Sequence, residues 1–138
     1  LSAKIIPDLA VASGARRAKQ TLERALEAFP EHVTHLIENT IYLASAGHLL
    51  ETLKQTPDKV HTLLVVGHNP GFGELASILA GAGAPHELDL MRIKYPTAAL
   101  AILDFNLSHW GEIDAGAARL NAYVTPAILR GESIDDPD

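Results

Sequence analysis

Short apolar runs bounded by turn residues recur along the chain and predict its β-strands. Runs that are nearly continuous are typical of strands in a sheet whose two faces are both covered. The clearest is residues 62–66, Thr-Leu-Leu-Val-Val, which ends at a Gly-His-Asn-Pro-Gly turn. Four further runs predict strands at residues 8–13, 35–38, 98–105 and 119–124.

Apolar residues at helical spacing predict helices between these strands. The first helix covers residues 15–29, where Ala18, Leu22 and Leu26 recur on one face. The same periodicity predicts helices over residues 42–54 and 72–79. Strands that alternate with helices indicate an α/β layered fold with a largely parallel sheet, to which the last two strands can add antiparallel pairing. Ligands of such sheets bind beyond the carboxyl ends of the strands.

Composition narrows the class of protein. A chain of 138 residues, 47% hydrophobic and 20% charged, suits a single domain, residues 1–138, with a buried core. The absence of cysteine excludes a disulfide framework and a thiolate zinc site. No apolar run approaches the roughly 18–20 residues of a membrane span, and the net charge of −6 argues against sequence-independent nucleic-acid binding. We therefore expect a cytoplasmic domain.

The first cluster with candidate chemistry is Ser-Gly-Ala-Arg-Arg-Ala-Lys-Gln-Thr at residues 13–21. It forms a strand-to-helix turn that places Arg16 and Arg17 in the first turn of the helix. Free N–H groups and the dipole at a helix start favour an anion, and a guanidinium adds bidentate hydrogen bonds to phosphate oxygens. The alternative is a solvated helix start with ordinary surface arginines.

The second cluster is Gly-His-Asn-Pro-Gly at residues 67–71. Gly67 permits a sharp turn and Pro70 fixes a non-helical exit, so His68 is presented at the sheet edge. A histidine there can donate a hydrogen bond to phosphate or stabilise charge on a phosphoryl group in transfer. A structural histidine in a tight turn is the alternative, but an arginine-bearing turn on another strand favours a phosphate site.

These two motifs resemble those of the histidine phosphatase superfamily, and most closely its SixA-like branch of phosphohistidine phosphatases. Four further runs match the branch and extend the resemblance over nearly the whole chain: Glu38 with residues 41–44, residues 95–101, residues 116–120 and residues 123–126.

The resemblance implies a three-layer α/β/α sandwich of the phosphoglycerate mutase-like type and phosphoryl transfer through a phosphohistidine intermediate, without metal or cofactor. Arg17 matches the family's second phosphate-clamping arginine, whereas Arg16 falls on a variable position. His68 matches the second histidine of the family, which hydrogen-bonds the phosphoryl group and does not attack it. Asn69 is expected to shape the pocket. Glu38 is a candidate general acid, with a surface glutamate at a strand end as its alternative.

The family's nucleophile lies in an Arg-His-Gly or Arg-His-Ala motif on a first strand near the amino terminus, and neither tripeptide occurs here. We expect Leu1 to follow a missing first strand and helix, so this fragment alone should be inactive. The intact protein is expected to hydrolyse a phosphohistidine on a protein or a small phosphoester. A non-catalytic phosphate- or phosphoprotein-binding domain is the alternative if the natural chain lacks that histidine.

The remaining motifs give weaker indications of function. His32 and His35 have no third ligand at a spacing suited to zinc. The Gly-Phe-Gly run at residues 71–73 lacks the third glycine of a dinucleotide-binding fingerprint. Trp110 is expected to pack against the core. The remaining histidines outside the motif are expected to be exposed: His48, His61, His86 and His109.

Overall fold

The computed structural model describes residues 6–29, 32–42, 44–67, 69–95 and 100–125. Within these ranges the elements follow one another as β1 Leu9–Ala12, α1 Arg16–Glu27, β2 Thr34–Ile37, η1 Asn39–Ile41, α2 Ala46–Lys54, β3 Leu63–Val66, α3 Gly71–Leu79, β4 Ala80–Gly83, α4 Pro85–Ile93, β5 Leu100–Phe105, η2 Trp110–Glu112 and β6 Ala118–Val124. None of the helices described is long and apolar enough to cross a membrane.

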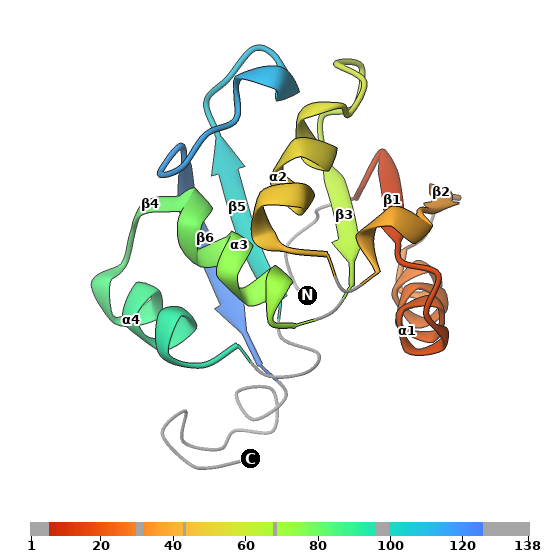
Figure 1. Ribbon diagram of the computed structural model, residues 1–138, viewed down its shortest axis with the longest axis horizontal. Helices are drawn as coiled ribbons and strands as arrows, with labels where there is room; N and C mark the ends of the chain where they lie inside the picture. Colours follow the sequence, from red (N-terminus) through yellow and green to blue (C-terminus); the bar gives the residue numbers. More distant parts are fainter. Residues whose placement is uncertain (1–5, 30–31, 43, 68, 96–99, 126–138) are drawn as a thin grey trace.

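The described strands form two three-stranded sheets (Figure 1). The first has the order β2-β1-β3 and is parallel throughout. The second has the order β4-β6-β5, in which β4 runs parallel to β6 and β5 runs antiparallel to it. The expectation of a mostly parallel arrangement with an antiparallel pair late in the chain is confirmed.

Helices cover the first sheet on both faces. Ala12 of β1 lies in a buried cluster with Leu22 of α1. Val11, the preceding residue, packs against a different cluster that contains Leu49 of α2 and Leu75 of α3. Successive side chains of a strand point to opposite faces, so α1 covers one face while α2 and α3 cover the other. This confirms the α/β/α layering.

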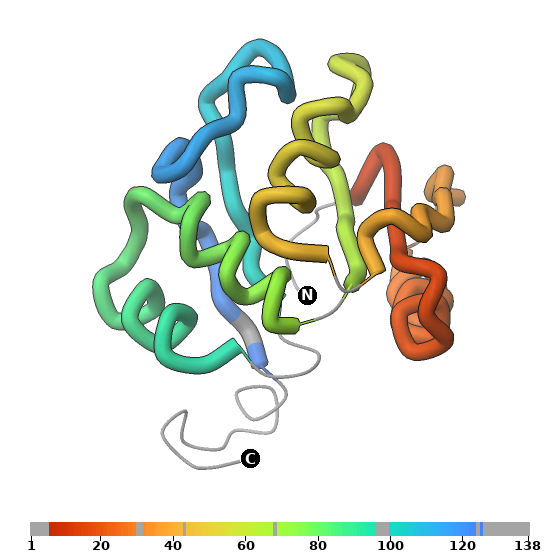
Figure 2. Tube along the Cα trace, viewed as in Figure 1, coloured from red at the N-terminus to blue at the C-terminus, as the bar shows by residue number. Residues whose placement is uncertain are grey.

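The helices α2 and α3 also join the two sheets. Val65 of β3 packs against the same buried cluster as Leu103 and Phe105 of β5. In the tube view both helices lie in front of the strands, with α4 beside β6 (Figure 2). A second cluster, with Met91 of α4 and Leu120 of β6, fills the space beneath α4.

All five predicted strands and the predicted helices are present, but one helix starts later than expected. The expected helix at residues 42–54 begins at Ala46, because the Ser45 hydroxyl caps it by accepting a hydrogen bond from the His48 N–H at 3.2 Å.

The sequence pattern does not predict β4 and α4. The Ala-Gly-Ala-Gly sequence of β4 has none of the branched or aromatic residues that favour strands. Its pairing with β6 depends on tertiary contact, since a Cβ on Gly81 would lie 2.1 Å from the Gly116 carbonyl oxygen. The α4 helix starts with Pro85 in its first turn.

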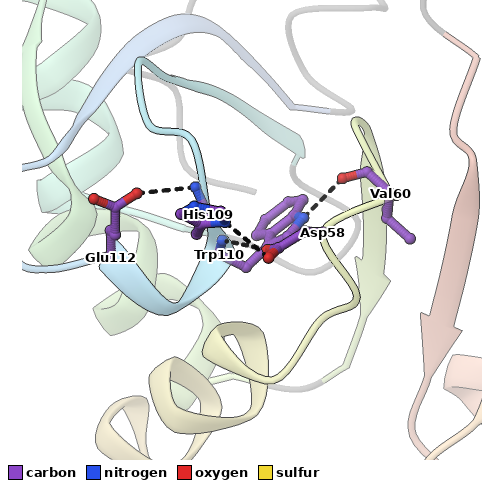
Figure 3. Close-up of polar contacts among 5 residues, drawn as sticks. All are labelled: Asp58, Val60, His109, Trp110 and Glu112. Atoms are coloured by element: carbon purple, nitrogen blue, oxygen red, sulfur yellow. Dashed lines mark hydrogen bonds and ion pairs between the residues drawn. The ribbon is translucent and has the colours of Figure 1, made fainter.

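At the end of the molecule where β3 begins, a polar network links the segment before β3 to the segment after β5 (Figure 3). The Asp58 carboxylate lies 2.8 Å from His109 Nδ1 and accepts from the Trp110 backbone N–H at 3.2 Å. The Trp110 indole N–H donates to the Val60 carbonyl at 2.8 Å, and its ring packs against the core. The expected packing role of Trp110 and exposure of His109 are both confirmed.

This network predicts a small dependence of stability on pH. The hydrogen bond with His109, followed by that from Trp110, lowers the pKa of Asp58, and the same carboxylate raises the pKa of His109. Because the folded-state pKa of His109 is raised, His109 stabilises the fold below pH 6.5. This stabilisation is lost as pH rises through the folded-state pKa of His109. The lowered pKa stabilises the fold above pH 3.8 and is lost as pH falls through the folded-state value of Asp58.

The free energy of unfolding should therefore differ most between wild type and Asp58→Asn in the interval between pH 3.8 and pH 6.5. Urea denaturation from about pH 3 to pH 8 measures the difference, with exposed Asp89→Asn as the control. The effect should be small because the His109 and Asp58 side chains are 63% and 54% exposed. A difference that stays constant over the whole pH range would show that the charges of Asp58 and His109 contribute nothing to the free energy of unfolding.

Candidate active site

The carboxyl ends of β1, β2 and β3 meet at one edge of the first sheet. The Ser13 N–H donates to the Val66 carbonyl at 3.0 Å, and the Glu38 N–H donates to the Ala12 carbonyl at 2.8 Å. The strands are thus in register where they end, so both sequence motifs leave the sheet at the same edge (Figure 1). His68, two residues after Val66, lies outside the described residues.

The turn from β1 into α1 is tightly packed. Ser13 is fully buried, and its hydroxyl accepts from the Ala15 N–H at 3.4 Å. Gly14 has no room for a side chain, because a Cβ there would lie 1.9 Å from Oδ1 of Asn39. The absence of a Cβ at Gly14 lets the chain that follows β2 pack against the turn that follows β1.

The arginines stand at the start of α1, directly after this turn. Arg16 and Arg17 are both exposed, and among the described residues no carboxylate forms an ion pair with either. The first turn of α1 contains no acidic residue, and no side chain caps its N-terminus within the described ranges. A positive helix end with two guanidinium groups favours an anion, as the sequence predicts. The phosphate contact of Arg17 stays a prediction.

The turn from β3 into α3 depends on its glycines. A Cβ on Gly67 would lie 2.2 Å from the ring of Phe72, and a Cβ on Gly71 would lie 2.2 Å from the Ala44 carbonyl oxygen. A Cβ on Gly73 would lie 2.9 Å from Cβ of Tyr95. Each glycine in this motif therefore has a packing reason, and none of them requires a dinucleotide.

Asn69 is bonded at both ends of its carboxamide. Its Oδ1 accepts from the Gly73 N–H at 3.0 Å, and its Nδ2 donates to the Tyr95 carbonyl at 2.6 Å. The sequence predicts only that this side chain shapes the pocket. An asparagine in a turn before proline signals the local bond to Gly73, but no sequence signal identifies the partner 26 residues away.

Glu38 has local partners in the structure. Its carboxylate accepts from the Thr40 backbone N–H at 3.3 Å and from the Thr40 hydroxyl at 2.9 Å, which caps the short helix η1. The residue is half-buried at the carboxyl end of β2. These contacts give Glu38 a structural role at the site edge, and its role as an acid stays a prediction.

The two histidines near the start of β2 do not gather further ligands. The rings of His32 and His35 lie 6.4 Å apart, and His35 contacts the Val33 carbonyl. Across the described ranges, no three or more histidine, aspartate or glutamate side chains are grouped as a metal site.

Comparison with known proteins finds no matching family model. An uncharacterised protein of Mycobacterium tuberculosis is 34% identical over 122 residues, which cover 86% of this chain and 73% of that protein. An uncharacterised protein of Mycobacterium leprae is 28% identical over 115 residues, covering 83% of this chain and 68% of its own length.

Two solved structures are similar to this fold. The "putative phosphohistidine phosphatase SixA" of Nakamurella multipartitia has a TM-score of 0.73 at 21% identity, covering 87% of this chain and 71% of that one. The protein of the same description from Agrobacterium tumefaciens has a TM-score of 0.65 at 25% identity, covering 88% and 69%. The similarity to these structures relates this chain to the histidine phosphatase superfamily, through its SixA-like branch.

The comparison confirms the expected phosphoglycerate mutase-like α/β/α fold of this SixA-like chain. The arginine motif and the histidine motif leave adjacent strands, β1 and β3, at one edge of the sheet. The elements that precede each motif explain this, because parallel strands in register present their carboxyl ends together.

Proposed function

We propose that the intact protein is a phosphatase that hydrolyses a phosphohistidine or a phosphoester through a covalent phosphohistidine intermediate. One observation carries the proposal: β1 and β3 pair in parallel, so the arginine motif and the histidine motif leave the sheet at the same edge. The arginine motif includes the start of α1, whose first turn has no acidic residue and which no side chain caps among the described residues. The similarity to SixA-type structures supports the same chemistry.

In the proposed reaction, an imidazole nitrogen of a histidine outside these 138 residues forms a bond to phosphorus. The bond from phosphorus to the leaving nitrogen or oxygen breaks, and its electron pair leaves with that atom, which then takes a proton. Water attacks the phosphohistidine and releases phosphate and the free imidazole. Arg17 binds the equatorial oxygens and His68 stabilises their growing charge. Glu38 is the lesser candidate for the proton donor.

The topology supports a place for the nucleophile. Among the described strands, β3 and β5 are each the last strand of their sheet, and both lie beneath α2 and α3. We place the nucleophile-bearing strand between β3 and β5, parallel to β3. Its carboxyl end would then lie beside the carboxyl ends of β1 and β3, which Ser13 and Gly67 follow.

A second candidate function is a non-catalytic phosphate- or phosphoprotein-binding domain. It is favoured by one observation, namely that the 138 residues contain the predicted phosphate ligands Arg17 and His68 but no Arg-His-Gly or Arg-His-Ala tripeptide. Both functions use the same anion site and differ only in the nucleophile.

Phosphate release by the full-length protein separates these functions. We would supply a histidine-phosphorylated protein and, separately, a small aromatic phosphoester, and measure phosphate release. Mass spectrometry at neutral pH would detect the acid-labile phosphoryl group on the enzyme. Turnover of either substrate with transient phosphorylation is expected. Binding of phosphate without any turnover would reject the enzyme and leave the binding domain.

Arg17→Ala should weaken the binding of phosphate or vanadate by about 2 kcal/mol, which is roughly 30-fold in Kd, because a charge-assisted contact is lost. Isothermal titration calorimetry measures the change. Arg24→Ala is a matched control, since Arg24 is also exposed but lies in the last turn of the same helix. Equal affinity of the Arg17 variant and wild type would return Arg17 to the ordinary surface.

A further inference from the structure

We propose that Asn69 is a positioning residue that holds the turn bearing His68 against both α3 and the chain at Tyr95. The inference rests on the proposed function, because it concerns the geometry of the phosphoryl-binding turn. Asn69 follows His68 directly and is the last residue before the Pro70 that precedes α3. Its side chain therefore acts on the same short turn.

The Asn69 side chain accepts one hydrogen bond and donates another. The Oδ1 atom accepts from the Gly73 N–H at 3.0 Å, while the Nδ2 atom donates to the Tyr95 carbonyl at 2.6 Å. At neutral pH, a side chain of this size supplies an acceptor and a donor in this planar arrangement only as a carboxamide. An aspartate has the same shape, but its ionised carboxylate would face the Tyr95 carbonyl oxygen with no proton between them.

The partner at Tyr95 is itself held in place. The Tyr95 ring lies 6.1 Å from the Tyr123 ring of β6, and the Tyr123 hydroxyl donates to the Lys94 carbonyl. Gly73 packs directly on Tyr95, since a Cβ on it would lie 2.9 Å from the tyrosine Cβ. Asn69 thus joins the turn to a segment that is anchored on the second sheet.

This arrangement matters for the proposed catalysis because the described residues on both sides of His68 are held in place. β3 fixes the chain before His68, through Val66, and Asn69 fixes the chain after it. A displacement of about 1 Å in a catalytic group can reduce the rate by roughly a hundredfold. Asn69 has both ends of its carboxamide engaged, so its proposed role is to position His68 and not to bind the phosphoryl group.

The test uses Asn69→Asp and Asn69→Ala in the full-length protein, with Asn106→Asp as a control for added charge at an exposed loop asparagine. Both Asn69 variants should lower kcat by about tenfold to a hundredfold at neutral pH and leave KM within about twofold. The Asn106 variant should match wild type. A large rise in KM with an unchanged kcat would overturn positioning and make Asn69 a substrate contact.

The pH profile separates positioning from a general loss of structure. Once the carboxyl introduced by Asn69→Asp is protonated, it can donate to the Tyr95 carbonyl and accept from the Gly73 N–H, as asparagine does. The kcat of Asn69→Asp relative to wild type should therefore rise as pH falls, whereas the ratio for Asn69→Ala should stay flat. Equal, flat ratios for both variants would overturn the proposal.

Two measurements keep this test distinct from that of the proposed function. If wild type shows no turnover, the proposed function fails; the amide hydrogen exchange of Gly73 then tests Asn69 alone, and should accelerate in Asn69→Ala. Unchanged exchange at Gly73 would overturn the positioning role whatever the activity. If Asn69→Ala does not fold, the pH profile of the isosteric Asn69→Asp variant decides the question.

Discussion

His68→Ala in the full-length protein should remove most of the turnover while leaving the fold intact. The strand before it ends at Val66, paired with Ala12, so the loss of the imidazole leaves the β1–β3 pairing untouched. What is lost is a hydrogen-bond donor to the charge that develops on the phosphoryl group. Removal of one such donor costs about 10²- to 10³-fold in kcat in enzymes that stabilise an oxyanion.

Rates of phosphate release under saturating substrate measure the effect. His48→Ala is the matched control, because His48 is an exposed histidine on α2 whose ring has no bond among the described contacts. The control should keep full activity, and the urea midpoints of both variants should match wild type. Near-normal kcat in His68→Ala would contradict the role assigned to this residue.

The parts of the fold that the sequence predicts well are those in which local pattern and burial agree. β1 and β3 are continuous apolar runs, and α1 places Ala18 and Leu22 on its buried face. β4 escapes prediction because its alanines and glycines have little strand preference, and only contact with β6 makes it a strand.

The candidate site likewise has features that the sequence predicts and features that it does not. Its edge follows from two strands that end in polar turns, so the sequence identifies the two motifs there. The phosphate-binding roles of Arg17 and His68 stay predictions. The bond from Asn69 to Tyr95 joins residues 26 positions apart, and the capping of η1 by Glu38 depends on how the chain leaves β2. Contacts of this kind are set by tertiary packing, which a pattern of apolar positions does not encode.

Gly71→Ala should lower the free energy of unfolding by about 3 kcal/mol, because overpacking against backbone has no cheap relaxation. The new Cβ would lie 2.2 Å from the Ala44 carbonyl oxygen and 3.3 Å from Leu49 Cδ1. Since Gly71 is the first residue of α3, a shift there also moves the turn that holds Asn69. Urea denaturation measures the change.

Gly47→Ala makes the same chemical change in a different environment and should have the opposite sign. Gly47 lies near the start of α2, and a Cβ there would meet nothing within 4 Å. Alanine loses less backbone entropy than glycine in a helix, so this variant should gain about 0.5 kcal/mol. Helix preference favours alanine at both positions, so the difference between the two variants isolates the contact with Ala44. If both variants were equally stable, α3 could not approach Ala44 as closely as it does here, and the geometry of the turn from β3 to α3 would be wrong.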